Sequence, residues 1–252
     1  ELWSAYCSRT DSVQPAIVNF DTGISRLGLD KTETEKVLND HSLLDSISIT
    51  YVMSHLACAD EPDHPLNLAQ NQKFKNIITK LSGQYLSSLS NSAGVFLGKD
   101  YHFDMVRPGA AIFGIGCTSN DRKNLHPVVA LEGKILQTRI IDRDSTVGYG
   151  AEGIVKKSSR IATVSLGYGD GLFRQLGDIG YGFIEGHRVP IIGRVSMDLV
   201  TINVTDLPET QCSEGKMVEF IGAHQSADEL AEKAGTIAYE IITAFGNRFS
   251  RQ

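Results

Sequence analysis

Two tyrosines of the sequence lie between glycines, each at the end of an apolar run. The first is Tyr149 in "STVGYGAE" (Ser145–Glu152), and the second is Tyr168 in "SLGYGDG" (Ser165–Gly171). Flanking glycines are typical of tight turns, because glycine adopts backbone conformations that other residues avoid. A phenol held out on such a turn can also donate or accept a proton. The pattern therefore allows an ordinary turn used twice, or an exposed tyrosine that does chemistry.

Polar residues also follow two predicted strands. "FDTGISRLG" (Phe20–Gly28) places Arg26 in a loop, and "VMSHLACAD" (Val52–Asp60) places His55 and Asp60 in the next one. Such loops form the active face of a barrel, where an arginine can pair with a carboxylate or phosphate. A histidine there can serve as a hydrogen-bond partner for an acid or base, since its pKa lies near neutrality. The alternatives are a surface arginine and a histidine that is satisfied in the core.

A candidate phosphate site comes from two further segments. "SLSNSAGVFLG" puts Asn91 and Ser92 at a predicted helix start, and "MVRPGAAIFG" puts Arg107, Gly109 and Ala110 just before a predicted strand. A hydroxyl and free amide N–H groups at a helix N-terminus can bind an anion, and glycine permits close backbone approach. The alternative for Asn91 and Ser92 is plain helix capping.

Other catalytic and metal-binding patterns do not stand out. The seven histidines have no H-x-x-x-H or H-x-x-E spacing, and neither a G-x-S-x-G motif nor a P-loop is present. In "GRVSMDLVTINV" the pair Met197–Asp198 opens a β run, which fits a structural methionine and a capping or solvated aspartate. The sequence therefore predicts no metal site.

Composition and charge narrow the possible partners. The net charge of −6 and the pI of about 5.6 argue against a nucleic acid or an anionic membrane, since either favours a basic face. No run of ~18 apolar residues is present. The four cysteines are widely spaced without a C-x-x-C pair, which indicates reduced thiols in a cytoplasmic protein.

The first half of the chain alternates predicted strands and helices. Strands are expected at Ala16–Asp21, Ser46–His55 and Ala110–Ile115, and helices at Lys31–Asp40, capped by Asp30 or Thr32, and around Pro65–Leu81. This alternation indicates βαβ units and a parallel sheet, with about four units before residue 118.

The second half is rich in predicted strands. Apolar runs broken by glycines begin near Leu125, and one amphipathic helix is expected at Ser226–Gly246, with Ser226 as N-cap and Glu229 completing a capping box. The boundary should lie near residues 118–126, so we expect one domain at 1–122 and a β-rich domain at 123–252.

Four parallel βα units alone would leave two unpaired strand edges and an uncovered core. The chain also starts without Met. We therefore expect an α/β barrel of the TIM type of which the chain holds only the C-terminal half, followed by the mostly β domain.

Taken together and in this order, the motifs resemble the alanine racemase family. The resemblance runs from about residue 16 to about residue 245 and includes "DTGISRLG", "SHLACAD", "NSAG", "MVRPGAAIFG", "VGYG", "TVSLGYGDG", "VPIIGRVSMD" and "GTIAYE". It implies a fold-type III protein with a pyridoxal 5'-phosphate barrel and a β domain, and a chain that corresponds to the C-terminal two-thirds of the family.

The resemblance implies interconversion of L- and D-alanine, which supplies D-alanine for peptidoglycan. Two bases on opposite faces move the α-proton, while the cofactor stabilises the carbanion. In the family one base is the cofactor lysine and the other is a tyrosine from the partner subunit, here Tyr149. A phenol has an ordinary pKa of about 10, so it needs nearby hydrogen bonds or positive charge to act as a base. His55 and Arg107 match the family residues for this role; Arg107 also contacts the pyridine nitrogen, and His55 lies against the ring.

The remaining roles follow from the same motifs. The resemblance assigns the cofactor phosphate to Asn91, Ser92, the backbone of Gly109 and Ala110, and the hydroxyl of Tyr239. It assigns the substrate carboxylate to Arg26 and to the backbone of Met197 from the partner, which implies a homodimer with shared active sites. The residues that it places along the substrate channel are Tyr168, Asp60, Arg174 and Arg194.

Several positions depart from the family pattern. Asn19 stands where many relatives carry a carbamylated lysine that orients the arginine corresponding to Arg26. Ser88 replaces a histidine that contacts the pyridine-side arginine in some relatives, and Ser196 replaces a cysteine. The largest departure is the absence of an "AVVKANAYGHG"-type stretch with the Schiff-base lysine, since none of the twelve lysines lies in such a context.

These departures keep two alternatives open beside alanine racemase. One is a truncated, non-catalytic protein that keeps the dimer and phosphate surfaces. The other is a racemase of broad specificity or for serine.

Overall fold

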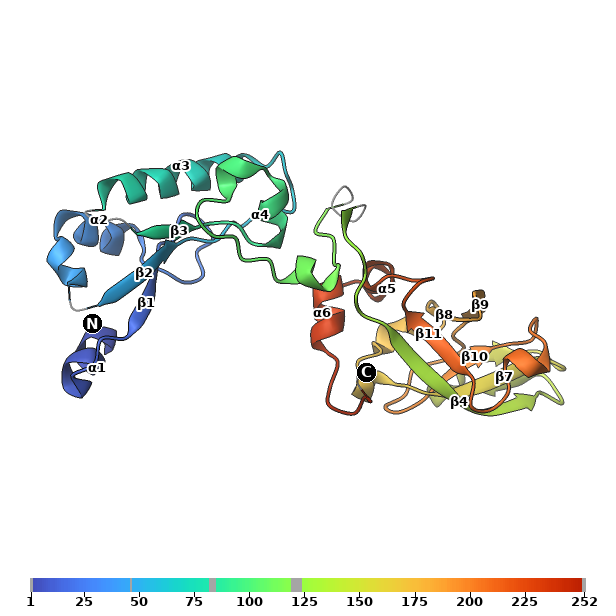
Figure 1. Cartoon of the computed structure of the whole chain (residues 1–252). Coiled ribbons are helices and arrows are strands. Elements are labelled where there is room, and N and C mark those ends of the chain that lie inside the picture. The colour runs from blue at the N-terminus through green and yellow to red at the C-terminus, as the bar shows by residue number, and fades with distance from the viewer. Residues whose placement is uncertain (1, 46, 82–84, 119–123, 251–252) are drawn as a thin grey trace. The chain divides into compact units, whose positions relative to one another are not determined.

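The computed structural model describes residues 2–45, 47–81, 85–118 and 124–250. Two compact units form the chain: unit 1 holds Glu1–Ile112 and Gly116–Leu125, and unit 2 holds Phe113–Ile115 and His126–Gln252. The predicted domain boundary, between residues 122 and 123, lies outside the described residues. Each unit is described by itself (Figure 1).

Unit 1 is built on a three-stranded parallel sheet in the order β1-β2-β3, formed by β1 (Pro15–Asn19), β2 (Ser48–Met53) and β3 (Leu86–Ser88). The first two strands confirm the sequence-based expectation. Helices α2 (Lys31–Asn39) and α3 (Pro65–Lys80) pack on this sheet (Figure 1). The shared core contains Phe20 and Val52 from the sheet side, Val37 of α2, and Phe74 and Ile77 of α3.

The ends of both helices follow local rules. The carboxylate of Asp30 accepts a hydrogen bond from Glu33 N (2.8 Å), and Glu33 Oε2 accepts one from Asp30 N (3.1 Å), so Asp30 is the N-cap of α2. The first residue of α3 is Pro65, where a missing N–H costs nothing. The shorter helical segments of this part of the chain are α1 (Leu2–Thr10), η1 (His41–Leu44), α4 (Ser92–Phe96), η2 (Lys99–Tyr101) and η3 (Ala110–Phe113).

The predicted strand at Ala110–Ile115 is wrong. The segment starts with the short 3-10 helix η3, and a single parallel bridge from Ser88 to Met105 takes the place beside β3. The amides of Gly109 and Ala111 both donate to the Ser92 hydroxyl, and Ile112 N donates to Gly109 O (3.2 Å). These bonds curl the backbone into a turn, so it cannot continue as a strand.

Unit 2 contains a six-stranded sheet in the order β10-β7-β4-β11-β8-β9, and the paired strands are antiparallel. The mostly β character of this half is therefore as expected. The strands are β4 (Leu131–Ile140), β7 (Arg160–Ser165), β8 (Tyr181–Ile184), β9 (His187–Pro190), β10 (Val200–Asn203) and β11 (Met217–Ile221). A separate hairpin joins β5 (Ser145–Val147) to β6 (Gly153–Val155). The 3-10 helices of this unit are η5 (Tyr149–Ala151), η6 (Tyr168–Asp170), η7 (Arg174–Leu176) and η8 (Glu209–Gln211).

The single helix expected at Ser226–Gly246 is two helices, α5 (Ala227–Ala234) and α6 (Ala238–Thr243). Ser226 and Glu229 form the predicted capping box of α5. The break lies at Gly235, which has φ 72° and ψ 32° and donates its N–H to the last carbonyls of α5. This left-handed conformation ends a helix and favours glycine.

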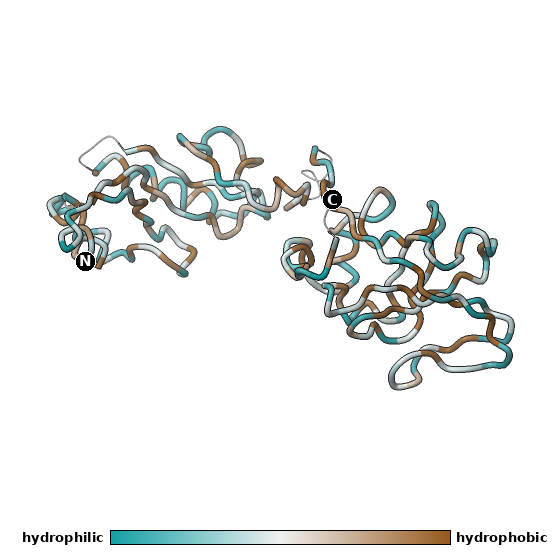
Figure 2. Tube along the Cα trace, turned by 60° about the horizontal axis from the view of Figure 1, so that its bottom comes forward, coloured by the Kyte–Doolittle hydropathy of each residue, from teal (hydrophilic) through white to brown (hydrophobic). Residues whose placement is uncertain are grey.

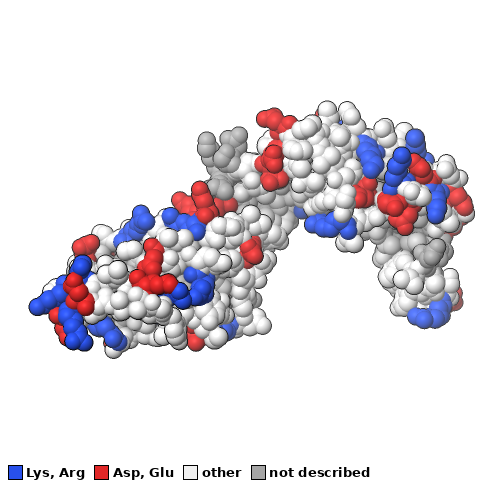
Figure 3. Space-filling view, turned by 180° about the vertical axis from the view of Figure 1, so that it is seen from behind, with Lys and Arg blue, Asp and Glu red and all other residues white. Residues whose placement is uncertain are grey.

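Neither hydropathy along the described trace nor charge on the face shown below singles out one region of the surface. Hydrophobic and hydrophilic stretches alternate along the trace in both units (Figure 2), and no helix of the described part is long and apolar enough to cross a membrane. Acidic and basic side chains are interspersed on the face shown in Figure 3.

Gly235→Ala should lower the free energy of unfolding by about 1 kcal/mol, because an L-residue is strained in the left-handed region. Gly235 has open space around its Cα, so strain is the only cost. Chemical denaturation monitored by circular dichroism measures the change. Gly246→Ala is the matched control, since Gly246 also has open space but lacks a positive φ. An equal effect of the two substitutions would contradict the assigned role of Gly235.

Candidate active site

The polar ends of β1 and β2 are joined by the side chain of Gln70, which lies on α3 and is fully buried. Its Nε2 donates to His55 O (2.8 Å) and to Thr22 Oγ1 (3.2 Å), and its Oε1 accepts from Ala57 N (2.9 Å). The hydroxyl of Thr22 in turn bonds that of Ser54 (2.7 Å). Every group in this cluster has a buried partner, so the cluster fixes where the β2 loop turns.

Sequence reasoning missed Gln70, although a signal was present. Gln70, Phe74 and Ile77 are spaced by four and three residues, which puts them on one face of α3. The buried face of α3 also carries Asn67 and Asn71. Polar side chains on a buried helix face are expected to be hydrogen-bonded.

His55 and Arg107, both predicted site residues, lie side by side. Arg107 NH2 is 3.4 Å from His55 Nδ1, and Asn91 Nδ2 is 3.4 Å from His55 Nε2. A guanidinium and an amide NH₂ can only donate, so the protonated imidazolium has no acceptor on either side. Burial, followed by the positive charges of Arg107 and Arg26, lowers the pKa of His55 below its ordinary value of 6.5. His55 is therefore a neutral imidazole at neutral pH.

Arg107 is held by oxygen acceptors from two strand ends. It donates from NH2 to Ser54 O (2.6 Å) and Leu89 O (3.4 Å), and from NH1 to the hydroxyl of Ser88. The Ser88 hydroxyl thus helps to hold the Arg107 guanidinium in place. Burial lowers the pKa of Arg107, yet a guanidinium stays charged at neutral pH. None of these acceptors is a carboxylate, so the positive charge is not neutralised by them.

Two segments of the predicted phosphate site meet at the hydroxyl of Ser92, although Ala110 and Tyr239 make no contact with it that the structure records. Its Oγ accepts from Gly109 N (2.8 Å) and Ala111 N (3.2 Å), which leaves the hydroxyl proton to donate elsewhere. Asn91 is the N-cap of α4 through Gly94 N (3.0 Å) and also donates to Leu56 O (3.3 Å). The capping alternative for Asn91 is therefore observed, and the same side chain reaches His55.

Arg26 lies exposed in the loop after β1. Its positive charge acts on His55, so it belongs to the same side of unit 1. Asn19 does not bind the Arg26 side chain but donates to Leu27 O (3.1 Å), which fixes the neighbouring backbone.

Burial raises the pKa of Asp21, but hydrogen bonds from the amides of Gly23, Ser25 and Ile24 lower it overall, so the carboxylate is charged while it holds this loop. Asp60 is exposed in the turn after β2.

In unit 2 Tyr149 lies at the tip of the hairpin, in η5, and its side chain is 73% exposed. Gly148 (φ 78°) and Gly150 (φ 77°) flank it in the left-handed region. The hairpin packs on the loop of Gly193 and Arg194: a Cβ on Gly150 would lie 3.1 Å from the Arg194 guanidinium carbon. Tyr149 is therefore an exposed tyrosine on a glycine-flanked turn, and its role in chemistry stays a prediction.

Arg194 and Arg174, both predicted channel residues, gather at Glu152 beside that hairpin. Arg194 Nε donates to Glu152 Oε2 (2.6 Å). The hydrogen bond from Arg194, and the charges of Arg194 and Arg174, lower the pKa of Glu152. Sequence reasoning did not single out Glu152, which neutralises part of this positive cluster.

Tyr168 and Met197 are joined through their backbones. Tyr168 N donates to Ser196 O (2.9 Å), and Gly169 N donates to Met197 O (2.8 Å). The side chains of Tyr168 and Met197 are 44% and 53% exposed. No described residue accepts a hydrogen bond from Met197 N, so this amide is available to a ligand. The hydroxyl of Ser196 donates to Leu199 O (2.6 Å), which stabilises the turn.

Tyr239 lies on α6 and contacts neither the Tyr149 hairpin nor the Tyr168–Met197 pair in any recorded hydrogen bond or ring contact. Its ring centroid is 6.4 Å from that of Phe113 in a tilted arrangement.

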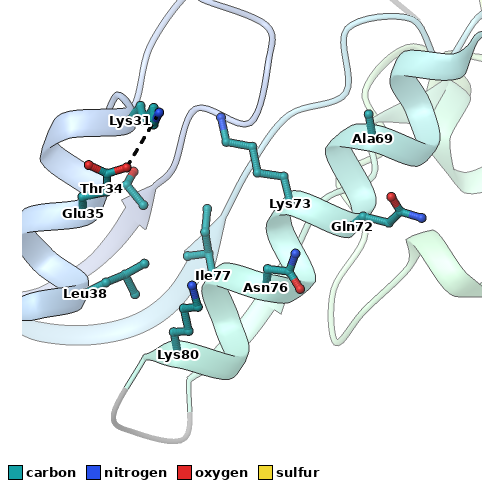
Figure 4. A pocket seen from close by; sticks show the side chains of 10 residues that line it. All are labelled: Lys31, Thr34, Glu35, Leu38, Ala69, Gln72, Lys73, Asn76, Ile77 and Lys80. Carbon is teal, nitrogen blue, oxygen red and sulfur yellow. Dashed lines mark ion pairs between the residues drawn. The ribbon is translucent and has the colours of Figure 1, made fainter.

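A separate groove of about 470 Å³ lies between α2 and α3 (Figure 4). Its lining contains none of the predicted site residues and consists of Lys31, Thr34, Glu35, Leu38, Ala69, Gln72, Lys73, Asn76, Ile77 and Lys80. This groove lies on the helical side of unit 1, whereas the predicted site residues follow the carboxyl ends of the strands.

Gln70→Leu should lower the free energy of unfolding by about 2–3 kcal/mol, because Ala57 N and His55 O lose their buried partner. Urea denaturation of both proteins measures the difference. Gln72→Leu, on the same helix but exposed, is the matched control and should stay within about 0.5 kcal/mol of the parent. Similar losses in the two variants would show that the Gln70 cluster is not the cause.

Arg107→Gln should raise the pKa of His55, because a positive charge that disfavours the imidazolium is removed. An NMR titration of the His55 ring measures it. In the parent the ring should titrate below 6.5 and stay neutral at pH 7. Arg9→Gln removes a cation that does not act on His55 and should leave the titration unchanged. An unchanged or lower pKa in Arg107→Gln would overturn this electrostatic account.

Comparison with known proteins gives the same organisation. Residues 1–116 match the family description "Alanine racemase, N-terminal domain", and residues 128–252 match "Alanine racemase, C-terminal domain". The expectation that the chain is only the C-terminal two-thirds of the family is inconsistent with the first match, because the chain contains sequence of both domains. The N-terminal barrel domain followed by a mostly β domain is thus the fold of the chain.

Individual relatives match along the whole chain. The alanine racemase of Rhodospirillum rubrum is 43% identical over 252 residues, and that of Brucella abortus is 42% identical over 264; all of this chain is covered, and 67% and 66% of theirs. The chain thus spans about two thirds of the length of these relatives. The crystal structure of alanine racemase from Bartonella henselae with covalently bound pyridoxal phosphate matches with a TM-score of 0.91 and 37% identity, covering 99% of this chain and 69% of that one. The chain belongs to the alanine racemase family.

Proposed function

We propose that the chain forms part of a pyridoxal-phosphate-dependent alanine racemase, which interconverts L- and D-alanine and supplies D-alanine for peptidoglycan. The observation that carries the proposal is the pairing of Arg107 with the neutral ring of His55 at the carboxyl ends of the strands. The relatives from R. rubrum and B. abortus, named alanine racemases, support the choice of reaction and substrate.

The residues of unit 1 fit the non-covalent part of the cofactor. The Ser92 hydroxyl has two amide donors on its oxygen, so its proton points to a further acceptor such as a phosphate oxygen. Gly109, Ala110 and Asn91 complete the part of the proposed phosphate set that unit 1 supplies. The hydroxyl of Tyr239, which belongs to unit 2, stays a prediction from the resemblance.

No lysine of described unit 1 fits the covalent part. These lysines lie on α2, α3 and η2 rather than in the strand-end loops: Lys31, Lys36, Lys73, Lys75, Lys80 and Lys99. The group that holds the cofactor covalently is therefore not assigned to a described residue of unit 1.

Bound at this site, pyridoxal phosphate would supply stabilisation of the carbanion that forms when alanine loses its α-proton. Arg107 would face the ring nitrogen, with its guanidinium fixed by Ser54, Ser88 and Leu89. A permanent cation there would disfavour protonation of that nitrogen, so Arg107 would limit the negative charge that the ring accepts and would suppress side reactions such as transamination. His55 contributes a flat, neutral surface.

Tyr149 is the proposed base on one face of the substrate. Its exposed place at the hairpin tip suits a residue that acts in the partner subunit rather than within its own unit. The phenol oxygen would take the α-proton of one enantiomer and, in the reverse reaction, return a proton on the same face to re-form that enantiomer, while the second base serves the opposite face. His55 and Arg107 are the proposed partners of that phenol.

The substrate carboxylate needs donors from two sides. Arg26 is exposed beside His55, and the partner's Met197 N–H is a backbone donor without a described acceptor. Tyr168, Asp60, Arg174 and Arg194 are the proposed walls of the access channel. The tyrosine ring narrows this path, which favours alanine over larger amino acids.

Three further features belong to the proposal. Unit 1 is one part of an eight-stranded barrel, supported by its three parallel strands. The active form is a homodimer with shared sites, domain 1–122 binding the cofactor and domain 123–252 serving the partner. The location is the cytoplasm, which suits four described cysteines that form no disulfide: Cys7, Cys58, Cys117 and Cys212.

Conversion of L-alanine to D-alanine, with α-deuterium exchange in heavy water, tests the reaction. The assay compares the 252-residue chain with the protein from its native source, both supplied with pyridoxal phosphate. Activity of the native protein alone would place the covalent cofactor group outside these residues. Equal rates with serine or lysine would reject alanine as the preferred substrate, and no exchange in either preparation would reject the racemase.

Tyr149→Phe should lower kcat by about 10²–10⁴-fold, because the ring is kept but the group that carries the proton is lost. Tyr168→Phe is the matched control: it changes the same kind of side chain in the proposed channel and should keep most of kcat. A loss of kcat in Tyr168→Phe as large as in Tyr149→Phe would reject the separation of roles.

Random mixing of Tyr149→Phe with Arg26→Ala subunits should restore roughly a quarter of the parent activity, since half of the dimers are mixed and each has one intact site. Mixing after mild unfolding and refolding provides the subunit exchange. Activity equal to that of the separate variants would reject shared active sites.

A further inference from the structure

Arg248 follows α6 and bridges the carboxylates of two different loops. Its Nε lies 3.2 Å from Asp170 Oδ1, and its NH2 donates to Asp198 Oδ1 (2.6 Å). The Asp170 side chain is 11% exposed, whereas those of Arg248 and Asp198 are about half exposed. The bridge thus has one buried end and one end at the surface.

Each carboxylate belongs to a segment that carries a proposed substrate-side residue. Asp170 closes the short helix η6 that starts at Tyr168, and its Oδ2 accepts from Gly167 N (2.9 Å). Asp198 directly follows Met197. Arg248 therefore connects the backbone around the channel tyrosine with the backbone around the free amide.

The two segments are also in close main-chain contact, and this requires glycine. A Cβ on Gly167 would lie 2.3 Å from Met197 O, and one on Gly169 would lie 2.5 Å from Arg248 NH1. The guanidinium thus lies directly on the Gly169 backbone, beside the hydrogen bond from Gly169 N to Met197 O (2.8 Å). No side chain separates the cation from the junction of the two loops.

Hydrogen bonds between Ser196 and Leu199 close the turn at Met197, but the outer side of this turn faces the surface. Met197 and Leu199 are exposed, as is the Asp198 side chain. Removal of Arg248 would leave two carboxylates close together without their shared cation, and like charges at short range repel. The expected result is a shift of the Met197 backbone away from Tyr168.

We propose that Arg248 is a positioning residue that holds the Met197 N–H and the Tyr168 ring in register for the substrate carboxylate. The relative placement of the two segments rests on the bridge that Arg248 forms with Asp170 and Asp198. That this placement serves substrate binding rests on the proposed function. An arginine suits the task because its planar fork can bind two carboxylates at once.

The kinetic test compares Arg248→Gln and Arg248→Lys with the parent holoenzyme. Arg248→Gln should raise KM for alanine about tenfold and keep kcat within about twofold, because a carboxylate contact acts on substrate and transition state alike. Arg248→Lys keeps the charge and should recover part of the loss. Arg188→Gln is the matched control, since Arg188 in β9 stacks on the Tyr181 ring (3.8 Å) away from these loops. An unchanged KM in Arg248→Gln, or an equal rise in Arg188→Gln, would overturn the proposal.

A second readout does not depend on activity. Amide hydrogen exchange at Tyr168 N and Gly169 N should become at least several-fold faster in Arg248→Gln, while the amides that pair β7 with β10 stay unchanged. Faster exchange throughout unit 2 would show a general loss of stability and would reject a positioning role. If the parent protein has no racemase activity but exchange at Gly169 still accelerates, the proposed function fails and the bridge stands.

Discussion

The side-chain amide of Gln70 satisfies three groups beneath the carboxyl ends of β1 and β2. Without Gln70, the part-buried His55 O and Ala57 N would have no hydrogen-bond partner among the described residues, and a buried group left in that state costs about 1–3 kcal/mol. The arrangement above depends on this contact, since the β2 loop can present the His55 ring to Arg107 only if its backbone turns here. Ser54 connects the Gln70 cluster with the Arg107–His55 pair, because its hydroxyl bonds Thr22 and its carbonyl accepts from Arg107.

Much of this arrangement could be predicted from the sequence. Parallel strands end at the same edge of a sheet, so polar residues after consecutive strands had to meet, as His55, Asn91 and Arg107 do. The caps Asp30 and Ser226 were readable because their hydrogen bonds span only three residues.

What the sequence did not reveal depends on contacts between distant residues. The apolar run at Ala110–Ile115 looked like a strand, but the Ser92 hydroxyl, seventeen and nineteen residues away, binds its first amides and turns the backbone. Arg248 lies 50 residues from Asp198, so no local pattern marks the pair. The break at Gly235 was visible as a glycine in a helical pattern, yet only its left-handed φ shows that one helix ends there.

The hydroxyl of Ser88 makes the support of Arg107 independent of pH near neutrality. The resemblance described above implies a histidine at this position in some relatives, and a histidine can gain or lose a proton near neutrality. A serine hydroxyl does not ionise in that range, so the hydrogen bond between Ser88 and Arg107 is the same in mildly acidic and neutral solution. Among His55, Ser88, Arg107 and Asn91, His55 is then the residue that can change its protonation state in this pH range. A change of pH therefore affects Arg107 through protonation of the His55 ring.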